Sequence, residues 1–573
     1  MKKIVSVLLL LAMLVLSLAS CGGKKGTDTE ATAGETEPAS AATETAAEET
    51  TAKATLDPKW DEVARSVRVI IEKDRTLKIE LSNHSDAEKT SKNDKYVVGP
   101  DEVVLGTTPR LDQLVYERNK AACDLLQVKP EYTYWDYAWS EQAEQIKTVV
   151  QGNASDAPDL FVNMISDLNV ANLNGVFKDI RSIPNSFFDF EAQGWMTDYM
   201  NSLSLTGDRS YVLAGDYFLD ILRALGVIPV NVTMMNANAE KLSPAILSED
   251  DSLGTGEQLS TRFFDFVEEG KWTWDVLGKL CEAIWVDSDG DGADSIKDQL
   301  GILTDTYGGD AAAGFVYTCG LPVTEDYWIE DETDEKYAGY HGKKWIKYSD
   351  DPTVLNLIFD AVKDVFDGKG SFTTAENRPF NTPEKPGLAY HYTKFAAGEV
   401  LFIGSLLLAA IETETIQQMP DLFSVVPCPK VNASDSYNTI IYNSGDVGAI
   451  NVNINPRKGK TLSAYLQFCT ENSGAIREQF QEIVMKYKVT TYDQGTDRMF
   501  NIIYNAILWG RDKTIEDVNV EPRWHGKMRE NKFTVGSEFI AKLYSENLSK
   551  KQSKLDSVMK TWYTLPKVEP EGN

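Results

Sequence analysis

Histidine, cysteine and positive charge are all scarce in this chain. It contains four histidines and six cysteines in 573 residues, and 57 Lys and Arg residues face 87 Asp and Glu residues, a formal net charge of −30. That charge makes nucleic acid and anionic lipid surfaces poor partners, whereas neutral or cationic ligands fit it better. No histidine lies in an HExxH or similar metal-ligand spacing, which argues against a histidine-based metal centre.

Patterns of catalytic residues are equally scarce. No CxxC spacing occurs, and beyond Cys21 an odd number of cysteines remains, which argues against a disulfide framework and a zinc site. Gly404-Ser405 lacks the glycine spacing of a nucleophile elbow, and Ile454 stands where a phosphate loop ending in Gly459-Lys460-Thr461 needs its first glycine. Paired carboxylates for glycoside hydrolysis stay open, because sequence does not show their separation in space. We expect no catalytic residues.

The N-terminus has the order of charge and hydrophobicity of a secretory signal. Lys2 and Lys3 precede an apolar run from Ile4 to Leu18, which is shorter than the roughly 20 residues of a transmembrane helix. The following Ala19-Ser20-Cys21 resembles a bacterial lipobox, in which the cysteine is acylated and becomes the new N-terminus. We predict a signal peptide over 1–20, lipidation of Cys21 and a lipid-anchored protein on the extracellular side of the cell membrane. A plain signal peptide with a chance cysteine is the alternative.

Residues 21–56 follow as a segment rich in Thr, Ala and Glu, with no aromatic residue. Such a composition cannot bury enough surface to offset the entropy of ordering, so we predict a disordered tether. The remaining chain, about 515 residues, is too long for one core and should form at least two domains.

Strand and helix signals alternate after the tether. We predict strands at 102–106, 132–134 and 159–162, each followed by a helical pattern, with Thr108-Pro109 and Ser140 as helix starts and Gly152 as a helix end. Further helices open at Asp351-Pro352 and Asn455-Pro456. This alternation is typical of a parallel sheet built from βα units. No internal repeat of 20 to 50 residues is visible in the sequence.

Trp272 and Trp274 flank a predicted helix start. Thr273 is placed to cap the helix with its side chain, and Trp272 is placed to pack on Leu277 as a hydrophobic staple. We therefore favour core packing over a ligand platform for both tryptophans.

An acidic loop follows that helix at 287–298. Asp287, Asp289 and Asp291 occupy the first, third and fifth positions, Ala293 offers a backbone carbonyl at the seventh, and Asp298 stands at the twelfth. This spacing resembles the EF-hand calcium loop, although Asp298 replaces the usual Glu. The five aspartates of the loop would repel one another without a cation. We predict a structural Ca²⁺ site, with a solvated acidic turn as the alternative.

The order of several motifs resembles one protein family. Ala157-Pro158-Asp159-Leu160-Phe161, Lys271-Trp272-Thr273-Trp274-Asp275 and the segment Phe395–Gly404 follow the lipobox and tether in the order seen in extracellular solute-binding proteins of family 1, the maltose-binding-protein-like group of carbohydrate ABC importers. The resemblance implies an α/β, two-lobed periplasmic-binding-protein-like fold of type II, with hinge-connected lobes and a ligand cleft between them. It places lobe 1 at 57–224 plus 447–510 and lobe 2 at 225–446 plus 511–573. The stretch 56–100 and the part after Ile476 depart from the family pattern.

The resemblance also implies a function without catalysis. The protein would capture a carbohydrate, with an oligosaccharide favoured, and deliver it to the permease subunits of an ABC transporter. Loops after sheet strands would line the cleft, which nominates these ligand-binding residues: Thr107, Arg110, Trp135, Asp136, Tyr137, Asn163, Asp167, Tyr307 and Ser405. Asp216 and Tyr217 are nominated from the crossover between the lobes, and Asp446 from the place where the family's chain crosses back. A surface-anchored glycan-active enzyme or adhesin is the alternative, and so is a binding protein for peptides.

Overall fold

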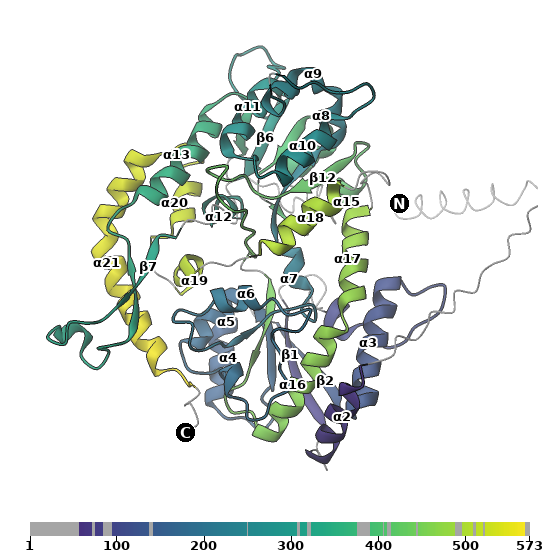
Figure 1. Ribbon diagram of the computed structural model, residues 1–573, viewed down its shortest axis with the longest axis vertical. Coiled ribbons are helices and arrows are strands. Elements are labelled where there is room, and N and C mark those ends of the chain that lie inside the picture. Colours follow the sequence, from purple (N-terminus) through teal and green to yellow (C-terminus); the bar gives the residue numbers. More distant parts are fainter. Residues whose placement is uncertain are drawn as a thin grey trace, which may run out of the picture. The chain divides into compact units, whose positions relative to one another are not determined.

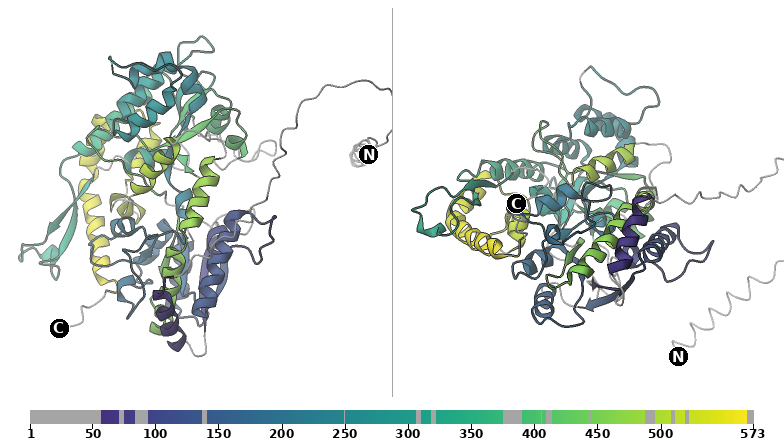
Figure 2. Two further views of the ribbon diagram at one scale, coloured as in Figure 1. Left: turned by 45° about the vertical axis from the view of Figure 1, so that its right-hand side comes forward. Right: turned by 60° about the horizontal axis from the view of Figure 1, so that its bottom comes forward.

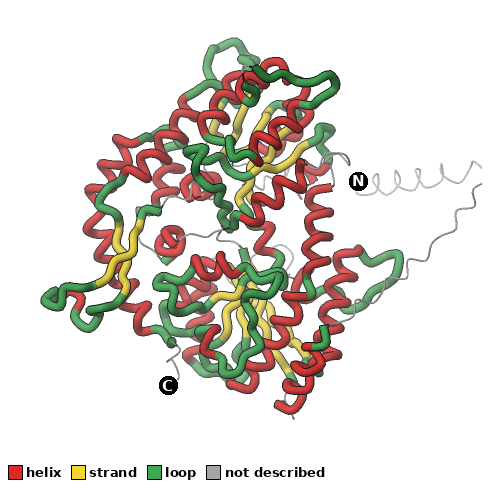
Figure 3. Tube along the Cα trace, viewed as in Figure 1, coloured by secondary structure: helices red, strands yellow, loops and turns green. Residues whose placement is uncertain are grey.

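Two separate α/β halves make up the folded chain. The computed structural model describes residues 57–70, 75–83, 94–136, 141–248, 250–305, 310–317, 322–374, 390–404, 406–408, 414–442, 445–486, 495–507, 511–518 and 522–567. The predicted signal peptide, Cys21 and nearly all of the predicted tether lie outside these residues. Figure 1 shows the elements in chain order, and Figure 3 shows the strands gathered into two sheets and a separate hairpin.

The first half is built on a five-stranded sheet. Its order is β2-β1-β3-β13-β4, with β1 parallel to β2 and β3, and β13 antiparallel to β3 and β4. The strands are β1 (Thr76–Asn83), β2 (Lys129–Asp136), β3 (Leu160–Met164), β4 (Val212–Leu213) and β13 (Asp446–Ile450). The helices of this half are α2 (Lys59–Ile70), α3 (Arg110–Leu126), α4 (Gln142–Gln151), α5 (Ile165–Asn172), α6 (Thr197–Ser202), α7 (Asp220–Arg223), α16 (Pro456–Glu471) and α17 (Gly474–Lys486).

The second half is built on a six-stranded sheet. Its order is β11-β5-β10-β6-β9, and β12 also pairs with β5. The strands are β5 (Gly226–Asn231), β6 (Leu300–Asp305), β9 (Ser371–Thr374), β10 (Val400–Ile403), β11 (Leu406–Leu407) and β12 (Phe423–Val426). The helices between these strands are α8 (Val232–Ala237), α9 (Ala239–Leu242), α10 (Leu259–Glu268), α11 (Trp274–Ile284), α12 (Asp310–Tyr317), α13 (Thr353–Asp367), α14 (Tyr390–Ala396) and α15 (Glu414–Gln417). A hairpin of β7 (Thr324–Trp328) and β8 (Lys344–Tyr348) interrupts them.

The two sheets repeat one strand order. In each sheet, three parallel strands lie side by side in the order β2-β1-β3 in the first and β9-β6-β10 in the second. The next strand is antiparallel and enters from the other half: β13 in the first sheet and β5 in the second. A short final strand borders that antiparallel strand in both sheets. The chain exchanges one strand between the two halves, which is the two-lobed α/β arrangement that the resemblance implies.

The segments that cross between the halves are hydrogen-bonded to each other. Leu225, just before β5, forms an antiparallel bridge with Ile441, on the return path to β13, and Tyr442 N donates to Ala224 O at 2.8 Å. A third crossing lies beside them, because Thr439 bridges to Ile507 beyond α18 (Gly495–Asn505). These crossings lie where the resemblance places the hinge between the lobes.

The C-terminal part touches both halves. α18 lies within the range assigned to lobe 1, yet it packs against α10 and β12 of the second half. α19 (Arg511–Asp517) packs against α5 of the first half, whereas α20 (Trp524–Glu530) packs on α12 and α21 (Ser537–Thr564) packs on α13 and β8. The C-terminal helices therefore pack on the second half, the first half and the second half in turn, and no single boundary at residue 510 separates them.

Several predicted elements are confirmed. β2 contains the predicted strand at 132–134, β3 begins at Leu160 and covers all but the first residue of the predicted strand at 159–162, and α13 and α16 begin at the two predicted proline-marked starts. Gly152 ends α4, while its N-cap residue is Glu141, and the predicted cap Ser140 lies outside the described residues. Trp272 and Trp274 are fully buried in the core, as the packing interpretation requires.

Two local predictions are wrong. Residues 102–106 form no strand: Thr108 Oγ1 accepts a hydrogen bond from Val104 N at 2.9 Å, the chain turns at Gly106 with φ +81°, and Leu105 is 86% exposed. The Thr273 side chain makes no capping hydrogen bond to α11. The amide of Trp274 instead donates to Lys430 O at 3.0 Å, so a neighbouring segment supplies a partner at this helix start.

Candidate functional site

The first sheet gathers several predicted ligand-binding residues at one edge. β1, β2 and β3 are parallel and end at Asn83, Asp136 and Met164, while antiparallel β13 begins beside them at Asp446. We call this the carboxyl edge of the first sheet. Ligands of open α/β sheets bind beyond such an edge, because the loops that follow the strands converge there.

Trp135 and Asp136 reach this edge as the last residues of β2. They pair in register with Ser82 and Asn83 of β1. The Trp135 ring is half-buried and lies 5.8 Å from the Phe161 ring of β3, centre to centre and tilted by 59°. A half-buried tryptophan at such an edge is suited to stacking against the C–H surface of a sugar.

Asn163 and Asp167 lie where β3 turns into α5. Asn163 is fully buried, its Nδ2 donates to Gln142 Oε1 at 3.3 Å, and its Oδ1 accepts from Met164 N at 2.8 Å. Asp167 is 6% exposed in the first turn of α5. A carboxylate in this position is favoured by the partial positive charge of the helix N-terminus.

A buried acid that the sequence analysis missed stands beside these residues. Glu80 on β1 has no exposed surface, and neither carboxylate oxygen has a hydrogen-bond partner among the residues that the structure describes. Burial raises the pKa of Glu80 well above its ordinary value, the charge of Asp446 raises it further, and the Asn163 side chain lowers it. Glu80 therefore holds its proton to a higher pH than an ordinary glutamate does. Leu77, Ile79 and Leu81 alternate with polar residues in the sequence. This alternation is the signal by which the strand that carries Glu80 could have been found.

Asp216 and Tyr217 lie inside the molecule rather than on a surface. Asp216 is 1% exposed, accepts a hydrogen bond from Arg477 Nη1 at 2.7 Å and another from the Tyr504 hydroxyl at 3.3 Å. Burial raises the pKa of Asp216 to about 6, although the Arg477 charge opposes the shift. The Tyr217 ring is fully buried against Tyr465, with the Arg118 guanidinium 4.9 Å from its centre.

The remaining nominated residues divide into two groups. Thr107 and Arg110 are exposed at the start of α3, where Arg110 lies 4.0 Å from Glu117, and they follow a turn rather than the strand that led to their nomination. Tyr137, Tyr307 and Ser405 lie outside the described residues.

The acidic loop folds tightly around its own backbone. Ligand atoms of Asp287, Asp289 and Asp291 lie within 4.8 Å of one another. Asp287 accepts hydrogen bonds from the amides of Gly290 and Gly292, both of which have positive φ, and Ala293 N donates to Asp291.

Asp298 closes the loop from its far end. Its two oxygens accept from Ser288 N at 2.8 Å and Ser295 N at 2.7 Å, and the side chain is buried. Burial raises the pKa of Asp298, but the backbone donors lower it more, so the carboxyl group stays ionised. Three of the four predicted aspartate ligands thus come together, and the fourth is engaged with the loop backbone.

Comparison with known proteins gives similarity in structure alone. No protein-family model matches the sequence, and a search of curated proteins finds no match. Among solved structures, a family 1 extracellular solute-binding protein from Bifidobacterium longum subsp. infantis is similar, with 12% identity, 85% of this chain and 99% of that chain covered, and a TM-score of 0.45.

Two further structures are similar to the same extent. An ABC substrate-binding protein from Listeria monocytogenes in complex with cycloalternan has 12% identity, covers 85% of this chain and 100% of its own, and has a TM-score of 0.44. The galacto-N-biose-/lacto-N-biose I-binding protein of the ABC transporter from Bifidobacterium longum, in complex with lacto-N-biose, has 12% identity, coverage of 86% and 99%, and a TM-score of 0.44.

The described helices are too short or too polar to cross a membrane. None of them combines the length and the apolar character that a membrane crossing requires.

Proposed function

We propose that this protein is an extracellular solute-binding lipoprotein that captures a carbohydrate, with an oligosaccharide favoured, and delivers it to the permease of an ABC transporter. The observation that carries the proposal is the repeated strand order of the two sheets, joined by crossing segments that hydrogen-bond to one another. Two similar halves on a shared hinge can trap a ligand by closing on it, because the ligand then stabilises the closed state by touching both.

The carboxyl edge of the first sheet supports a sugar as the ligand. Trp135 offers a half-buried ring, Asn163 and Asp446 bring amide and carboxylate groups to the same edge, and Asp136 ends β2 beside Trp135. Sugars present C–H faces to aromatic rings and hydroxyls to such groups. We propose binding rather than catalysis, so the captured sugar leaves the protein chemically unchanged.

A thermal-shift screen of the mature protein against a glycan panel, with peptides as a second panel, tests this proposal. A ligand at 100 times its Kd stabilises the protein by about 2.7 kcal/mol. The best carbohydrate should raise the melting temperature and be recovered intact after long incubation. Stabilisation by peptides alone, or cleavage of the sugar, would overturn the proposal.

Trp135→Ala tests the placement of the site. The substitution should weaken binding of the best carbohydrate by about 1 to 3 kcal/mol through lost stacking, with little change in melting temperature. Titration calorimetry and thermal unfolding measure both on one variant. Trp328→Ala is the matched control, because Trp328 is 59% exposed on the β7–β8 hairpin and should leave binding unchanged. A Trp135→Ala variant that binds as wild type does would remove this edge from the site.

We further propose that the lipid on Cys21 holds the protein at the outer face of the cell membrane. The proposal rests on the lipobox-like Ala19-Ser20-Cys21 after an apolar run. Since one thiol would carry the whole linkage, Cys21→Ala should move the protein from the membrane to the soluble fraction. Cell fractionation of the two forms measures this, and equal retention of both would contradict the anchor.

The acidic loop supports a third proposal, a structural Ca²⁺ ion held by Asp287, Asp289 and Asp291. Carboxylate oxygens are the ligands that Ca²⁺ prefers, and glycines with positive φ form the sharp turns of such loops. Asp298, buried and bonded to two backbone amides, would shape the loop rather than hold the ion.

A further inference from the structure

The last helix of the chain is long and packs along the second half. α21 has 28 residues, about 42 Å at the rise of an α-helix. Ser537 N at its start donates to Asp360 Oδ1 of α13 at 2.6 Å. Further along, Asp556 accepts from Trp345 Nε1 of β8 at 2.9 Å and pairs with Lys336. Most of α21 therefore belongs to the second half.

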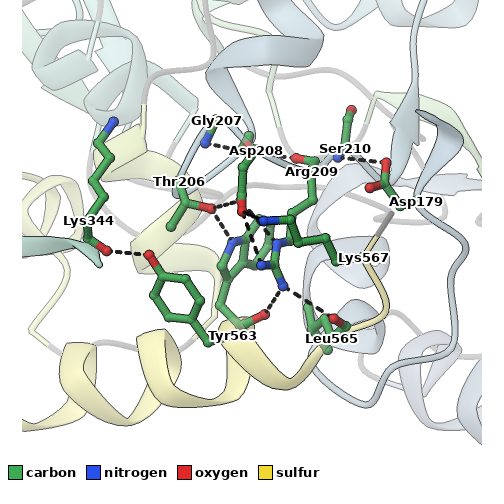
Figure 4. Close-up of polar contacts among 12 residues, drawn as sticks. Asp179, Thr206, Gly207, Asp208, Arg209, Ser210, Lys344, Tyr563, Leu565 and Lys567 are labelled. Atoms are coloured by element: carbon green, nitrogen blue, oxygen red, sulfur yellow. Dashed lines mark hydrogen bonds and ion pairs between the residues drawn. The ribbon is translucent and has the colours of Figure 1, made fainter. Parts of the chain in front are cut away.

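The end of α21 is bound to the first half instead. Arg209 Nη1 donates to the carbonyl oxygens of Trp562 at 2.9 Å and Leu565 at 3.2 Å, and Trp562 Nε1 donates to Thr206 Oγ1 at 2.8 Å (Figure 4). The Tyr211 hydroxyl donates to Pro566 O at 2.7 Å. The receiving segment belongs to the first sheet, since β4 follows it directly and Ser210 N donates to Asp179.

Charge reinforces this attachment. Arg209 is 2% exposed, and its guanidinium satisfies carbonyls at the helix C-terminus, where a cation is favoured. Asp208 lies between Arg209 Nε at 3.1 Å and Lys567 Nζ at 2.8 Å (Figure 4). Burial acts to raise the pKa of Asp208, but these two cations and Thr206 together lower it, so Asp208 stays ionised.

The attachment lies away from the crossing segments. α7, which directly precedes the first crossing, lies near the middle of Figure 1, whereas α21 runs along its left-hand side, and the two views of Figure 2 keep α21 apart from α17. The halves are thus joined by the hinge, by the end of α21, and by α19, which packs on α5 while Arg511 Nη2 donates to Thr324 O of β7 at 2.9 Å. A hinge movement must also open the attachment at the end of α21 or carry α21 off α13 and β8.

We propose that residues 206–211 and 562–567 form a clasp that restricts the hinge movement between the two halves. Opening the clasp exposes Trp562 and leaves the Arg209 charge without its carbonyls, whereas peeling α21 from the second half breaks far more packing. Of the two contacts that α21 makes, the clasp is therefore the one that yields when the halves move. This inference does not depend on which ligand the protein binds.

Two substitutions break the clasp in different ways. Arg209→Ala removes the buried donor. Lys567→Glu places a like charge beside Asp208 at a residue whose side chain is 45% exposed, so the fold should tolerate it. Lys336→Ala is the matched control, because it removes an ion pair of α21 that lies within the second half.

The readout is the distance between the halves. Spin labels on unnatural amino acids at Lys129 of β2 and Lys279 of α11, both exposed, report it in ligand-free full-length protein by pulsed electron resonance. Both clasp variants should broaden or shift the distance distribution, and amide exchange at Leu565 should be about ten- to a hundred-fold faster than in wild type. The Lys336→Ala distribution should match wild type.

Three results would overturn the clasp. The first is an unchanged distance distribution in Lys567→Glu and in folded Arg209→Ala. The second is broadening in Lys336→Ala as large as in the clasp variants, which would show only a loosened helix. The third is faster exchange at Leu565 with no change in the distance, which would show a frayed helix end without a mechanical role. Sugar titration is separate, so loss of the clasp and failure of the proposed function are distinguishable.

Discussion

Glu80 is an acidic residue in surroundings that do not favour a charge. It stands on a central strand, with Phe161 of β3 and Thr133 of β2 as its register partners, and has no exposed surface. An ionised carboxylate there would lose its hydration without gaining a full set of donors. Retaining a proton relieves part of that cost, and the pKa of Glu80 rises accordingly.

The pKa of Glu80 gives stability a defined pH dependence. In the unfolded chain Glu80 ionises near its ordinary pKa of 4.5, whereas the folded protein holds the proton to higher pH. The unfolded state thus binds fewer protons above pH 4.5, and this residue makes stability fall as pH rises from there to the folded pKa. Glu80→Gln should remove that fall and stabilise the protein at pH 8 by about 1 to 3 kcal/mol.

Urea unfolding at pH 5 and pH 8 measures this effect. Glu117→Gln is the control, because Glu117 is a 61% exposed glutamate on α3 and should leave the pH dependence as it is. Equal pH dependence in wild type and Glu80→Gln would show that Glu80 ionises normally in the folded protein.

At the scale of elements, sequence predicts best where the signal is local. Asn455 caps α16 with its side chain, which accepts from Arg457 N at 2.9 Å, and Pro456 takes the first helical position. Thr273 carries the same kind of signal, yet its side chain makes no capping hydrogen bond to α11. Thr273 instead forms a β-bridge with Lys430, far along the chain, and a local pattern does not contain that neighbour.

Strands show the same limit. Val103-Val104-Leu105 has the composition of a strand and forms a turn, while the actual first strand, β1, carries Lys78 and Glu80 within its sequence. A strand exists only when a neighbouring strand accepts its hydrogen bonds, and β1 obtains β2 and β3 on its two sides. Four nominated residues lie at one edge of the first sheet: Trp135, Asp136, Asn163 and Asp446. Their positions depend on strands that were identified in the sequence, or on the crossing back between the lobes that the resemblance implied.

The acidic loop makes a prediction at this scale. Ca²⁺ should raise the melting temperature of chelator-stripped protein, and Asp287→Ala combined with Asp289→Ala should abolish the rise, since both remove proposed ligands. Asp275→Ala, an exposed aspartate on α11 that pairs with Lys279, is the control and should keep the response. Titration calorimetry that finds no calcium uptake by the stripped wild type would exclude the site.

At the scale of the whole molecule, the repetition of strand order is invisible in the sequence. β1 and β6 hold equivalent positions in their sheets, yet one reads TLKIELSN and the other LGILTD. Only the pairing pattern relates them, and pairing depends on contacts between distant residues. The resemblance to a family implied the two lobes, whereas the path of the C-terminal helices between the halves followed from no local signal.

A buried ion pair and a neighbouring hydrogen bond join three distant parts of the chain near the crossings. Asp216 precedes α7, Arg477 lies on α17 of the first half, and Tyr504 lies on α18, which packs on the second half. Arg477 is the cation that compensates the buried Asp216 carboxylate, whose pKa burial nevertheless raises to about 6. Removing one partner of a buried pair leaves a buried charge uncompensated, at a cost of about 3 to 5 kcal/mol.

Arg477→Met should therefore destabilise the whole protein, and more at pH 8 than at pH 5. Without the Arg477 charge the pKa of Asp216 rises further, so at pH 5 the carboxyl group takes up a proton and most of the penalty disappears, whereas at pH 8 ionisation costs stability. Adding Asp216→Asn should restore much of the loss at pH 8, a coupling of about 1 to 3 kcal/mol between the two sites. Lys363→Met breaks an exposed pair with Asp367 and should change stability by less than about 1 kcal/mol at either pH. Losses that are equal at both pH values, or strictly additive in the double variant, would show that Asp216 does not depend on Arg477 for its charge.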